Sequence, residues 1–519
     1  MPRFKYYSYE QGQFLSVQFK NQILPDTFEY ALNYIVDNEM DLTVFHDRIR
    51  NDETGAPAYD PAIMLKIVIY GYARGLLHSR EIERACQENV MFMALSANTR
   101  PHFTTIAEFI STLSDGIEPL FLDVLMYCDK LGLIGKEMFA IDGCKISSNA
   151  SKEWSGTRED FEKKKSKYKK SISYLLKKHR EEDKRGKIDP EEREKEKKAK
   201  THFREKIKKI QSWLDENEDK KGSEGNIKKS HLIDNESSKM VSSHGVIQGY
   251  NGVAMVDGKH QVIVGSDIPE ENSEKDALKP MVEGVEKNFE RLGKKDIYKD
   301  AKVTGDTGFH SEKNMEMLHK KGIDAYVADN RFRKRDPKFE TAARHNKPTD
   351  RHRGKKRYQK KYFSSNEFQL NKRTGKLICP AGKELYVKSR SFKTQQGFYG
   401  TKYMGKITDC RACDLRTRCL RRGETQARQV VKFRGVDKSK NPTFSQWMRD
   451  RIDSMKGRYL YSQRMGIAEP PFAHIRDKLG LNRFTMRGRK KNRAQWRMFT
   501  MVHNLLKAYR YGWMVPETG

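Results

Sequence analysis

Asp142 lies in a sequence context that favours chemistry over exposure to solvent. It stands within the apolar stretch 138–146. An alternating strand over that stretch places Asp142 on the same face as Ala140 and Cys144. A carboxylate among apolar side chains is costly unless it is paired or bound to a metal. Asp142 is therefore a candidate for a catalytic or metal-binding group.

Two further acidic residues stand at the ends of predicted elements. Asp306 follows a predicted strand, in the segment GDTGFHS, and ligand-binding groups in open α/β sheets favour the carboxyl ends of strands. Glu469 precedes Pro470 and Pro471, which suit the first turn of a helix. Taken singly, each acid is more often a helix cap or a turn residue, because perturbed carboxylates also serve structure.

The combination of the three acids is more specific than any one of them. Carboxylate oxygens are preferred ligands of Mg²⁺ and Mn²⁺. Two such ions about 4 Å apart can activate a nucleophile and stabilise the leaving oxygen in phosphoryl transfer. The residue types of Asp142, Asp306 and Glu469 would therefore suit such a two-metal site.

A second set of candidate ligands consists of cysteines. Cys379, Cys410, Cys413 and Cys419 follow the pattern C-P, then C-x2-C-x5-C, and four thiolates would close a structural Zn²⁺ site. The alternative is four reduced thiols in a small β insertion. The other three cysteines lie in apolar patterns and are predicted to be core residues: Cys86, Cys128 and Cys144.

The charge of the chain indicates a polyanionic partner. Its 519 residues include 102 Lys and Arg against 70 Asp and Glu, which gives a formal net charge of +32 at pH 7. Nucleic acid is the commonest partner of such a chain, although a highly charged and partly disordered protein would have the same balance. The longest apolar run, 63–73, is too short to span a membrane. Without a signal peptide or a dense cysteine framework, we expect a cytoplasmic, nucleoid-associated protein.

A basic run near the end of the chain is predicted to contact DNA phosphates, and its alternative is a solvated helix face. The run includes Arg483, Arg487, Arg489, Lys490 and Lys491. In the apolar helix that follows, His503 and Asn504 are predicted to be structural residues.

The spacing of apolar residues predicts the helices and strands that would position these candidate residues. Residues 60–130 are predicted to form several helices, one of them starting at a capping box of Thr105 and Glu108. They would form either a DNA-binding domain of the helix-turn-helix kind or a plain helical bundle. The middle of the chain reads as a strand, a hairpin with an Asp257-Gly258 turn, a helix, a strand, a helix and a strand. This order predicts an α/β fold with an RNase H-like mixed sheet.

Two segments interrupt the predicted core. Residues 157–230 are highly charged and are expected to form two solvated helices or a partly disordered arm. Residues 333–360 form a basic, Pro-containing linker, and 361–435 carry the cysteine cluster. The predicted domains are a helical DNA-binding domain at 1–130, the first part of the catalytic domain at 135–345 with the charged arm inserted, a Cys-rich zinc-ribbon-like insertion at 355–435, and the end of the catalytic domain at 440–515.

Several segments resemble bacterial insertion-sequence transposases of the DDE class. GAPAYDPAIMLKIVIYGYARGLLHSREIERACQENVMFMAL resembles the N-terminal domain of that family, FAIDGCKISSNAS and GDTGFHS resemble its two Asp motifs, and RFTMRGRKKNRAQWRMFTMVHNLLK resembles its C-terminal end. Tyr461, Arg464, Glu469 and Arg476 resemble its Tyr-Arg-Glu-Lys signature. One extra residue separates Arg464 from Glu469, and Arg476 stands where Lys is usual; Arg also contacts phosphate.

The resemblance implies that Asp142, Asp306 and Glu469 are the metal-binding triad, and that Tyr461, Arg464 and Arg476 contact DNA. It implies metal-dependent cleavage of double-stranded DNA at the terminal inverted repeats of a mobile element, followed by strand transfer into target DNA. It also implies a homo-oligomer on paired ends, with no membrane partner. The alternatives are an RNase H-fold nuclease without strand transfer and a non-catalytic DNA-binding regulator derived from a transposase.

Overall fold

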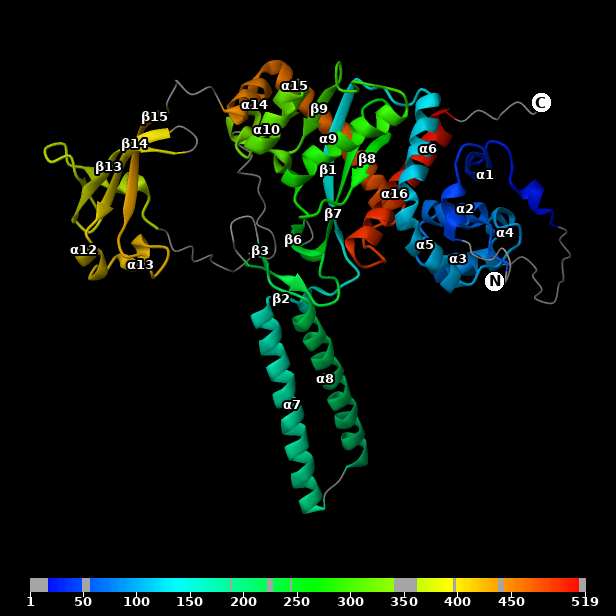
Figure 1. Cartoon of the computed structure of the whole chain (residues 1–519), viewed down its shortest axis with the longest axis horizontal. Coiled ribbons are helices and arrows are strands. Elements are labelled where there is room, and N and C mark those ends of the chain that lie inside the picture. The colour runs from blue at the N-terminus through cyan, green and yellow to red at the C-terminus, as the bar shows by residue number, and fades with distance from the viewer. Residues whose placement is uncertain are drawn as a thin grey trace, which may run out of the picture. The chain divides into compact units, whose positions relative to one another are not determined.

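The chain divides into two compact units (Figure 1), one formed by Met1–Asp329 with Ser454–Gly519 and the other by Asn330–Asp453. The computed structural model describes residues 17–48, 57–186, 189–221, 227–242, 245–339, 362–394, 398–436 and 443–512. Most of the predicted basic linker, residues 340–361, lies outside the described residues.

The first unit begins with helices, as predicted for residues 60–130. They are α1 (Phe28–Asn38), α2 (Pro61–Ala73), α3 (Ser79–Glu88), α4 (Val90–Leu95), α5 (Phe103–Thr112) and α6 (Ile117–Lys130). The predicted capping box was wrong. The helix α5 begins two residues earlier than Thr105, because the His102 side chain accepts a hydrogen bond from the Thr104 amide and serves as the N-cap.

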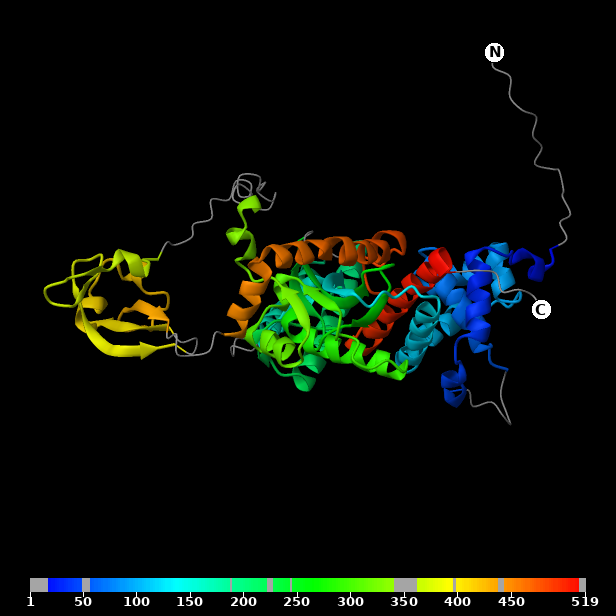
Figure 2. The same ribbon diagram turned by 90° about the horizontal axis from the view of Figure 1, so that it is seen from above.

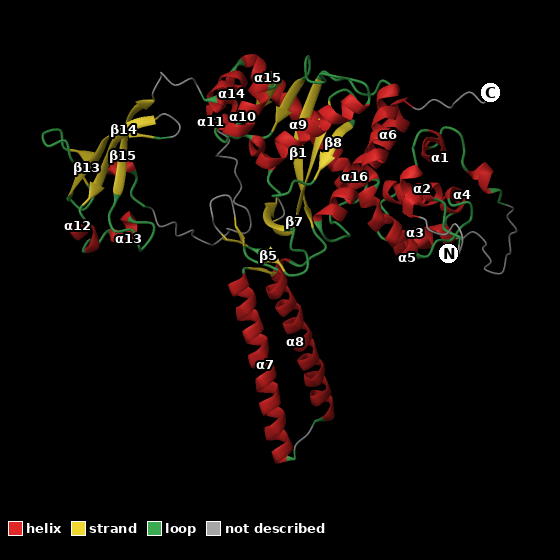
Figure 3. Cartoon of the chain, viewed as in Figure 1, coloured by secondary structure: helices red, strands yellow, loops and turns green. Residues whose placement is uncertain are grey.

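A mixed sheet forms the centre of the first unit (Figure 3). Its strands are β1 (Met138–Ser147), β6 (Ser238–Ser242), β7 (Gly245–Asp257), β8 (Ile263–Asp267), β9 (Lys302–Gly305) and β10 (Asp324–Val327). The order is β10-β9-β1-β7-β6, and β8 also pairs with β7. β9 is parallel to β1 and to β10, whereas β1, β6 and β8 are antiparallel to β7. The predicted hairpin is confirmed as β7 and β8.

Helices cover this sheet and bury its apolar side chains. They are α9 (Glu274–Arg291), α10 (Glu312–Lys320), α15 (Met455–Ala473) and α16 (Arg489–Gly512). The fully buried Trp496 of α16 packs on β7 at Gly252, where any Cβ would press on the indole ring. Its Nε1 donates to the Val253 carbonyl at 3.0 Å.

The helix α16 also joins the sheet to the N-terminal helices. It packs against α1, α2, α5 and α6, and Figures 1 and 2 both show the first helices, in blue, beside the last helix, in red. The boundary predicted between a helical domain at 1–130 and a catalytic domain from 135 therefore stays a prediction, since both regions share α16 as a packing partner.

The charged segment forms two long helices, α7 (Arg158–Arg185) and α8 (Pro190–Glu216). They run side by side and form a helical arm within the first unit (Figure 1). Short strands β2 (Ser155–Gly156) and β5 (Ser230–His231) pair at the root of the arm. This outcome is the first of the two predicted alternatives, two solvated helices.

The second unit contains a five-stranded antiparallel sheet. Its strands, in spatial order, are β11 (Gln369–Leu370), β12 (Leu377–Ile378), β13 (Glu384–Lys393), β14 (Phe398–Gly405) and β15 (Gln429–Val436). Phe368, Leu377 and Leu385 form part of its small buried core. The unit ends with α14 (Phe444–Asp453), whose Asp453 pairs with Arg335 at 2.6 Å.

None of the described helices is both long enough and apolar enough to cross a membrane. The cysteines predicted to be core residues, Cys86, Cys128 and Cys144, are buried. Burial also raises the pKa of the Cys86 and Cys128 thiols to about 12. The prediction that these three cysteines are core residues is therefore confirmed.

His503 and Asn504 are structural, as predicted. Burial lowers the pKa of His503 to about 3, so its ring is neutral, and Nε2 lies 3.0 Å from the Gln261 carbonyl oxygen. The Asn504 amide bonds both backbone groups of Ile263, accepting from its N–H at 2.8 Å and donating to its carbonyl at 2.8 Å. Asn504 thus helps to tie β8 to α16, together with Arg493, Arg497 and Thr500 of the same helix.

We expect Asn504→Ala to lower the free energy of unfolding of the first unit by at least about 2 kcal/mol, because it leaves two buried backbone groups of Ile263 unpaired. Urea unfolding followed by circular dichroism would measure the loss. The control is Asn38→Ala on an exposed helix face, for which a change within about 0.5 kcal/mol is expected. Equal losses in the two variants would contradict this role of Asn504.

Candidate active site

The register of two parallel strands brings Asp142 and Asp306 to the same level of the sheet. Ile141 of β1 pairs with Gly305 of β9, and each aspartate is the next residue along its strand direction. Adjacent strands lie about 4.8 Å apart, so the two carboxylates start from neighbouring positions. Asp306 stands at the carboxyl end of β9, where its side chain accepts from the Thr307 amide at 2.5 Å.

Glu469 comes from α15, which packs on β1, β7, β9 and β10. The prediction that Pro470 and Pro471 open a helix was wrong. They lie in the last turn of α15, and their carbonyls accept from the amide of His474. A proline in the interior of a helix costs a backbone hydrogen bond. Here both prolines lie near the end of α15, which passes into a short π-helix at His474–Lys478.

The three predicted acids line one cleft of about 920 Å³. Asp142 and Asp306 are partly buried, whereas Glu469 is exposed. The wall also contains basic and polar side chains, Lys145, Arg476 and Asn482. Among the described residues, no three Asp, Glu, His or Cys side chains converge closely enough to hold a metal ion. The side chains of the three acids still suit hard divalent cations, because all three are carboxylates and all three line the same cleft.

Arg464 neutralises Asp142 across the wall of the cleft. Its guanidinium Nη1 lies 2.7 Å from the Asp142 carboxylate, and the side chains are only 11% and 20% exposed. Burial raises the pKa of Asp142, Arg464 opposes that rise, and Asp306 adds to it. The Arg464 Nε is buried without a hydrogen-bond partner within the described part of the chain. Arg464 does not itself line the cleft, and it compensates the charge of the first acid from behind the lining residues.

Glu274, the first residue of α9, is a fourth acid in the cleft that the sequence analysis missed. Burial raises its pKa, Lys145 opposes the rise, and Asp306 and Asp142 add to it. A Cβ at Gly308 would overlap the Glu274 carboxylate, and one at Gly143 would lie 3.3 Å from it. The glycines that follow both aspartates thus leave room for Glu274. The sequence feature that could have identified Glu274 is an acid in the first turn of the helix that follows the hairpin.

The residues predicted to contact DNA have different environments. Arg476 lines the cleft. Arg464 is buried against Asp142, and its guanidinium lies over the Tyr461 ring at 5.8 Å. Arg489 pairs with Glu236 and Glu270. The exposed members of the set are Arg483, Arg487, Lys490 and Lys491.

Two of the exposed arginines are held by backbone contacts. Arg483 and Arg487 donate through Nε to the carbonyls of Ser148 and Asn149, at 3.0 and 3.1 Å. Their other guanidinium nitrogens remain available in geometry to a phosphate, since Arg carries five N–H donors. The predicted contacts of this set with DNA stay predictions.

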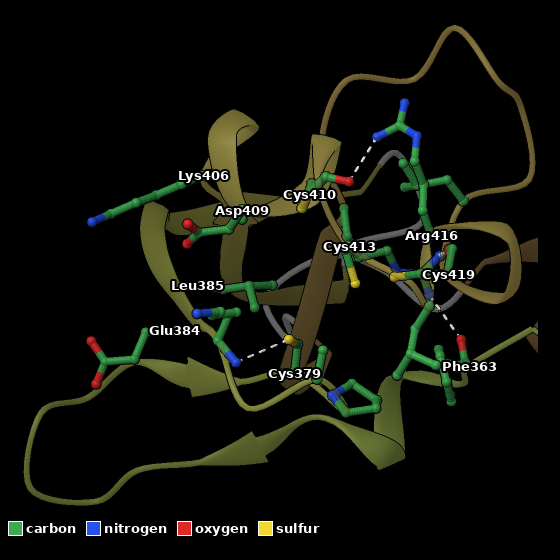
Figure 4. A pocket seen from close by; sticks show the side chains of 17 residues that line it. Phe363, Cys379, Glu384, Leu385, Lys406, Asp409, Cys410, Cys413, Arg416 and Cys419 are labelled. Carbon is green, nitrogen blue, oxygen red and sulfur yellow. Dashed lines mark hydrogen bonds between the residues drawn. The ribbon is translucent and has the colours of Figure 1, made fainter.

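In the second unit, all four cysteines of the predicted cluster line one small pocket of about 40 Å³ (Figure 4). The backbone amide of Lys383 donates to the Cys379 sulfur at 3.3 Å. Burial raises the pKa of the Cys419 thiol, Arg428 lowers it, and Cys410, Cys379 and Cys413 raise it. Thiol ligands suit a soft cation such as Zn²⁺, but within the described residues the four sulfurs do not converge closely enough to hold one.

Comparison with known families gives two matches. The profile described as Transposase DDE domain matches residues 378–509, and the profile described as Transposase domain (DUF772) matches residues 17–112. The matched ranges include Glu469 but neither Asp142 nor Asp306. No curated protein and no solved structure matches the chain significantly. Both matches are to transposase models, and together they support an insertion-sequence transposase of the DDE class, in agreement with the resemblance of its motifs.

We expect Arg464→Ala to raise the pKa of Asp142 above its value in the native chain, because the guanidinium stabilises only the charged carboxylate. Arg464→Lys, which retains the charge, should raise the pKa less. NMR titration of protein labelled at the aspartate carboxyl carbon would measure the shift. Arg476→Ala removes a cleft arginine without this ion pair and is the control. An unchanged Asp142 pKa in Arg464→Ala would contradict the charge compensation.

Proposed function

We propose that this transposase cleaves double-stranded DNA at the ends of a mobile element in a metal-dependent reaction and joins the freed ends to target DNA. The observation that carries the proposal is the shared cleft of Asp142, Asp306 and Glu469, which brings together acids from two parallel strands and a distant helix. Their resemblance to the metal-binding triad of the family adds support.

We propose that the sheet of the first unit is an RNase H-like core. In its support, β1 lies between an antiparallel neighbour, β7, and a parallel neighbour, β9, and β10 continues the parallel side. Two acids lie at the junction of the antiparallel and parallel parts. The proposed catalytic domain would include the helical arm, and the cysteine-bearing sheet would be an insertion before Glu469.

Asp142, Asp306 and Glu469 would hold two Mg²⁺ or Mn²⁺ ions. When bound, such ions polarise the scissile phosphate, lower the pKa of a bound water and stabilise the leaving oxygen. Hydrolysis forms a bond from the water oxygen to phosphorus and breaks the bond to the 3′ oxygen, which leaves as a hydroxyl. In strand transfer that hydroxyl oxygen attacks a target phosphodiester in the same way.

Other side chains would position the reactants. Arg464 would orient Asp142 and favour its ionised form before a cation enters the cleft. Arg476, which lines the cleft, is placed to contact a phosphate next to the cut. The exposed Arg483 and Arg487 would hold the duplex backbone outside the cleft together with Lys490 and Lys491. Tyr461 is proposed to act at the DNA through its position beside Arg464.

The DNA partners would be the terminal inverted repeats of the element and a target duplex. We propose that the N-terminal helices bind DNA and that two or more copies of the chain act on paired ends. These assignments rest on the family, whose members cut and move DNA. A nuclease without strand transfer and a regulator without catalysis are the outcomes that the following test separates from a transposase.

We expect Asp142→Ala, Asp306→Ala and Glu469→Ala each to reduce cleavage at least about hundredfold, because metal-ion charge stabilisation contributes several kcal/mol and each 1.36 kcal/mol corresponds to tenfold in rate. Binding of the same DNA should persist. The substrate is DNA carrying both ends native to the gene, with Mg²⁺ or Mn²⁺, and nicks and joined products are mapped. Glu271→Ala, an exposed acid outside the cleft, is the control.

The products distinguish the three functions. Cuts and joints at the element ends that disappear in Asp306→Ala would support the transposase. Cutting without joined products would favour the nuclease, and DNA binding without cutting in the native chain would favour the regulator. Retained cleavage in all three alanine variants would exclude the proposed metal site.

We also propose that the cysteine pocket holds one structural zinc ion. Cys379, Cys410, Cys413 and Cys419 would be its ligands, and the Lys383 amide already donates to one of the sulfurs. Such backbone donors orient ligands and reduce the charge on a thiolate. The ion would stabilise a unit whose buried core is small.

Elemental analysis of protein purified without chelator should give one zinc per chain. Cys410→Ser with Cys413→Ser should remove it and lower the unfolding temperature of the second unit, since a structural zinc site contributes folding free energy. Cys86→Ala, in the helical core, should leave the zinc content unchanged. Native protein that contains no zinc would refute this site.

A further inference from the structure

The helical arm carries a pattern of charge that the cleft does not explain. Its root is anchored by a cluster of Phe161, Ile210, Trp213 and Leu214, and Arg158 donates to the carbonyl of Leu214. These four are the buried residues of α7 and α8. Above the root the arm therefore exposes its side chains on most sides, and their charges are not dictated by packing.

The charges along the arm are segregated. Residues 163–170 include six Lys and no acid, and residues 197–209 include seven Lys or Arg and one Glu. Tyr168 stacks on Phe203 at 5.4 Å, which places the two stretches opposite each other. We call the basic residues of 163–170 and 197–209 the basic belt. It lies between the root and the distal end of the arm.

Acidic residues gather instead at the distal end, where they neutralise their basic neighbours. Lys178 pairs with Glu192 and Glu196 at 2.7 Å, and Arg193 pairs with Asp183 at 2.6 Å. A solvated helical face usually carries such alternating pairs. The basic belt lacks this compensation over most of its length, and like charges that close together repel one another. A partner of opposite charge would relieve that repulsion.

The basic belt includes a groove of about 530 Å³ between the two helices. Lys169 of α7 and Arg204 and Lys208 of α8 line it, and within the described part of the arm none of the three forms an ion pair. Asp215 and Glu216, which also line the groove, accept hydrogen bonds from Gln211 and Ser212. Three cations from two helices thus face one groove, which also carries these two carboxylates and keeps a positive excess.

The shape and composition of the belt favour a duplex over an acidic protein. The thirteen residues of 197–209 span about 20 Å of helix at 1.5 Å per residue, or roughly six base pairs at 3.4 Å each. Protein interfaces have an apolar core, whereas the large exposed apolar side chains of the arm, Tyr174 and Leu176, lie outside the belt. Phosphate contacts require only positioned cations.

We propose that the basic belt binds the backbone of duplex DNA independently of sequence, with Lys169, Arg204 and Lys208 contacting phosphates. This inference rests on the proposed function, because that function brings DNA to the chain. The arm would hold DNA flanking the reacting phosphate, while the cleft performs the chemistry.

The test is the triple variant Lys169→Gln, Arg204→Gln, Lys208→Gln in the full chain. Gln favours helices about as well as Lys and Arg, and circular dichroism should show unchanged helix content. The control triple variant is Lys184→Gln, Arg185→Gln, Lys195→Gln, which removes the same charge from exposed positions at the distal end. Binding to a 30-base-pair duplex without element ends is measured by fluorescence anisotropy from 50 to 200 mM salt.

Each lost phosphate contact reduces the slope of log K against log salt by roughly 0.9. Three lost contacts should make the affinity of the belt variant about 40-fold less sensitive to this salt increase than that of the native chain. The control should keep the native slope. A belt variant with the native slope, or equal changes in both variants, would overturn the proposal, and the first result would leave an acidic protein as the partner to seek.

The cleavage assay separates this proposal from the proposed function. End-specific cleavage that depends on Asp306, with DNA binding insensitive to the belt, would overturn the belt alone. Belt-dependent binding without any cleavage would support the belt and overturn the transposase reaction. A native chain that binds no duplex DNA would overturn both.

Discussion

A carboxylate within a sheet needs a compensating positive charge, and Arg464 supplies it to Asp142. Removing one partner of a buried ion pair generally costs about 3–5 kcal/mol, because the other charge is left unpaired. The pair also connects α15 to β1, and Glu469 lies farther along the same helix. The contact that favours the ionised form of the first acid therefore helps to fix the helix that carries the third. The position of Asp306 is set instead by the pairing of β9 with β1.

The large positive charge of the chain is distributed unevenly. Along α16, arginines are compensated by acids of the first unit: Arg489 by Glu236 and Glu270, Arg493 by Asp267 and Glu270, and Arg497 by Glu118. In the arm, the distal end is compensated, whereas most of the basic belt is not. A surplus of charge identifies a polyanion as the partner class, but the uncompensated cations identify where it binds. By this criterion the arm is a stronger candidate for backbone contact than the start of α16.

Two long inserted segments, the helical arm and the second unit, separate the three acids in the sequence without separating them in space. The arm leaves after β1 and returns before β6, and the second unit lies between β10 and α15. Each inserted segment begins and ends next to an element of the first unit, so the insertion does not change the strand order of the sheet. Side chains of the cleft thus come from β1, the segment after β9, the start of α9 and α15. This arrangement allows the arm and the cysteine-bearing unit to take on separate roles, as we propose.

The sequence by itself determined most of the sheet unit. Local periodicity and turn chemistry identified the hairpin of β7 and β8 and the two helices α9 and α10 that follow it, because these signals act within a few residues. The motif types also selected Asp142, Asp306 and Glu469, which the fold brings to one cleft. Local signals misplaced the helix around Pro470, since prolines are tolerated near the end of a helix as well as at its start.

Only the tertiary structure decided which basic and acidic residues form ion pairs. Arg464 stands 322 positions from Asp142 in the chain, and no local pattern distinguishes a buried counter-ion from a phosphate ligand. Glu274 was missed for the same reason: an acid in the first turn of a helix is ordinary, and its place beside Gly143 and Gly308 depends on the packing of α9 on the sheet. The sequence thus specified donors and strands, whereas long-range packing specified their partners, because electrostatic compensation depends on distance in space and not on separation in sequence.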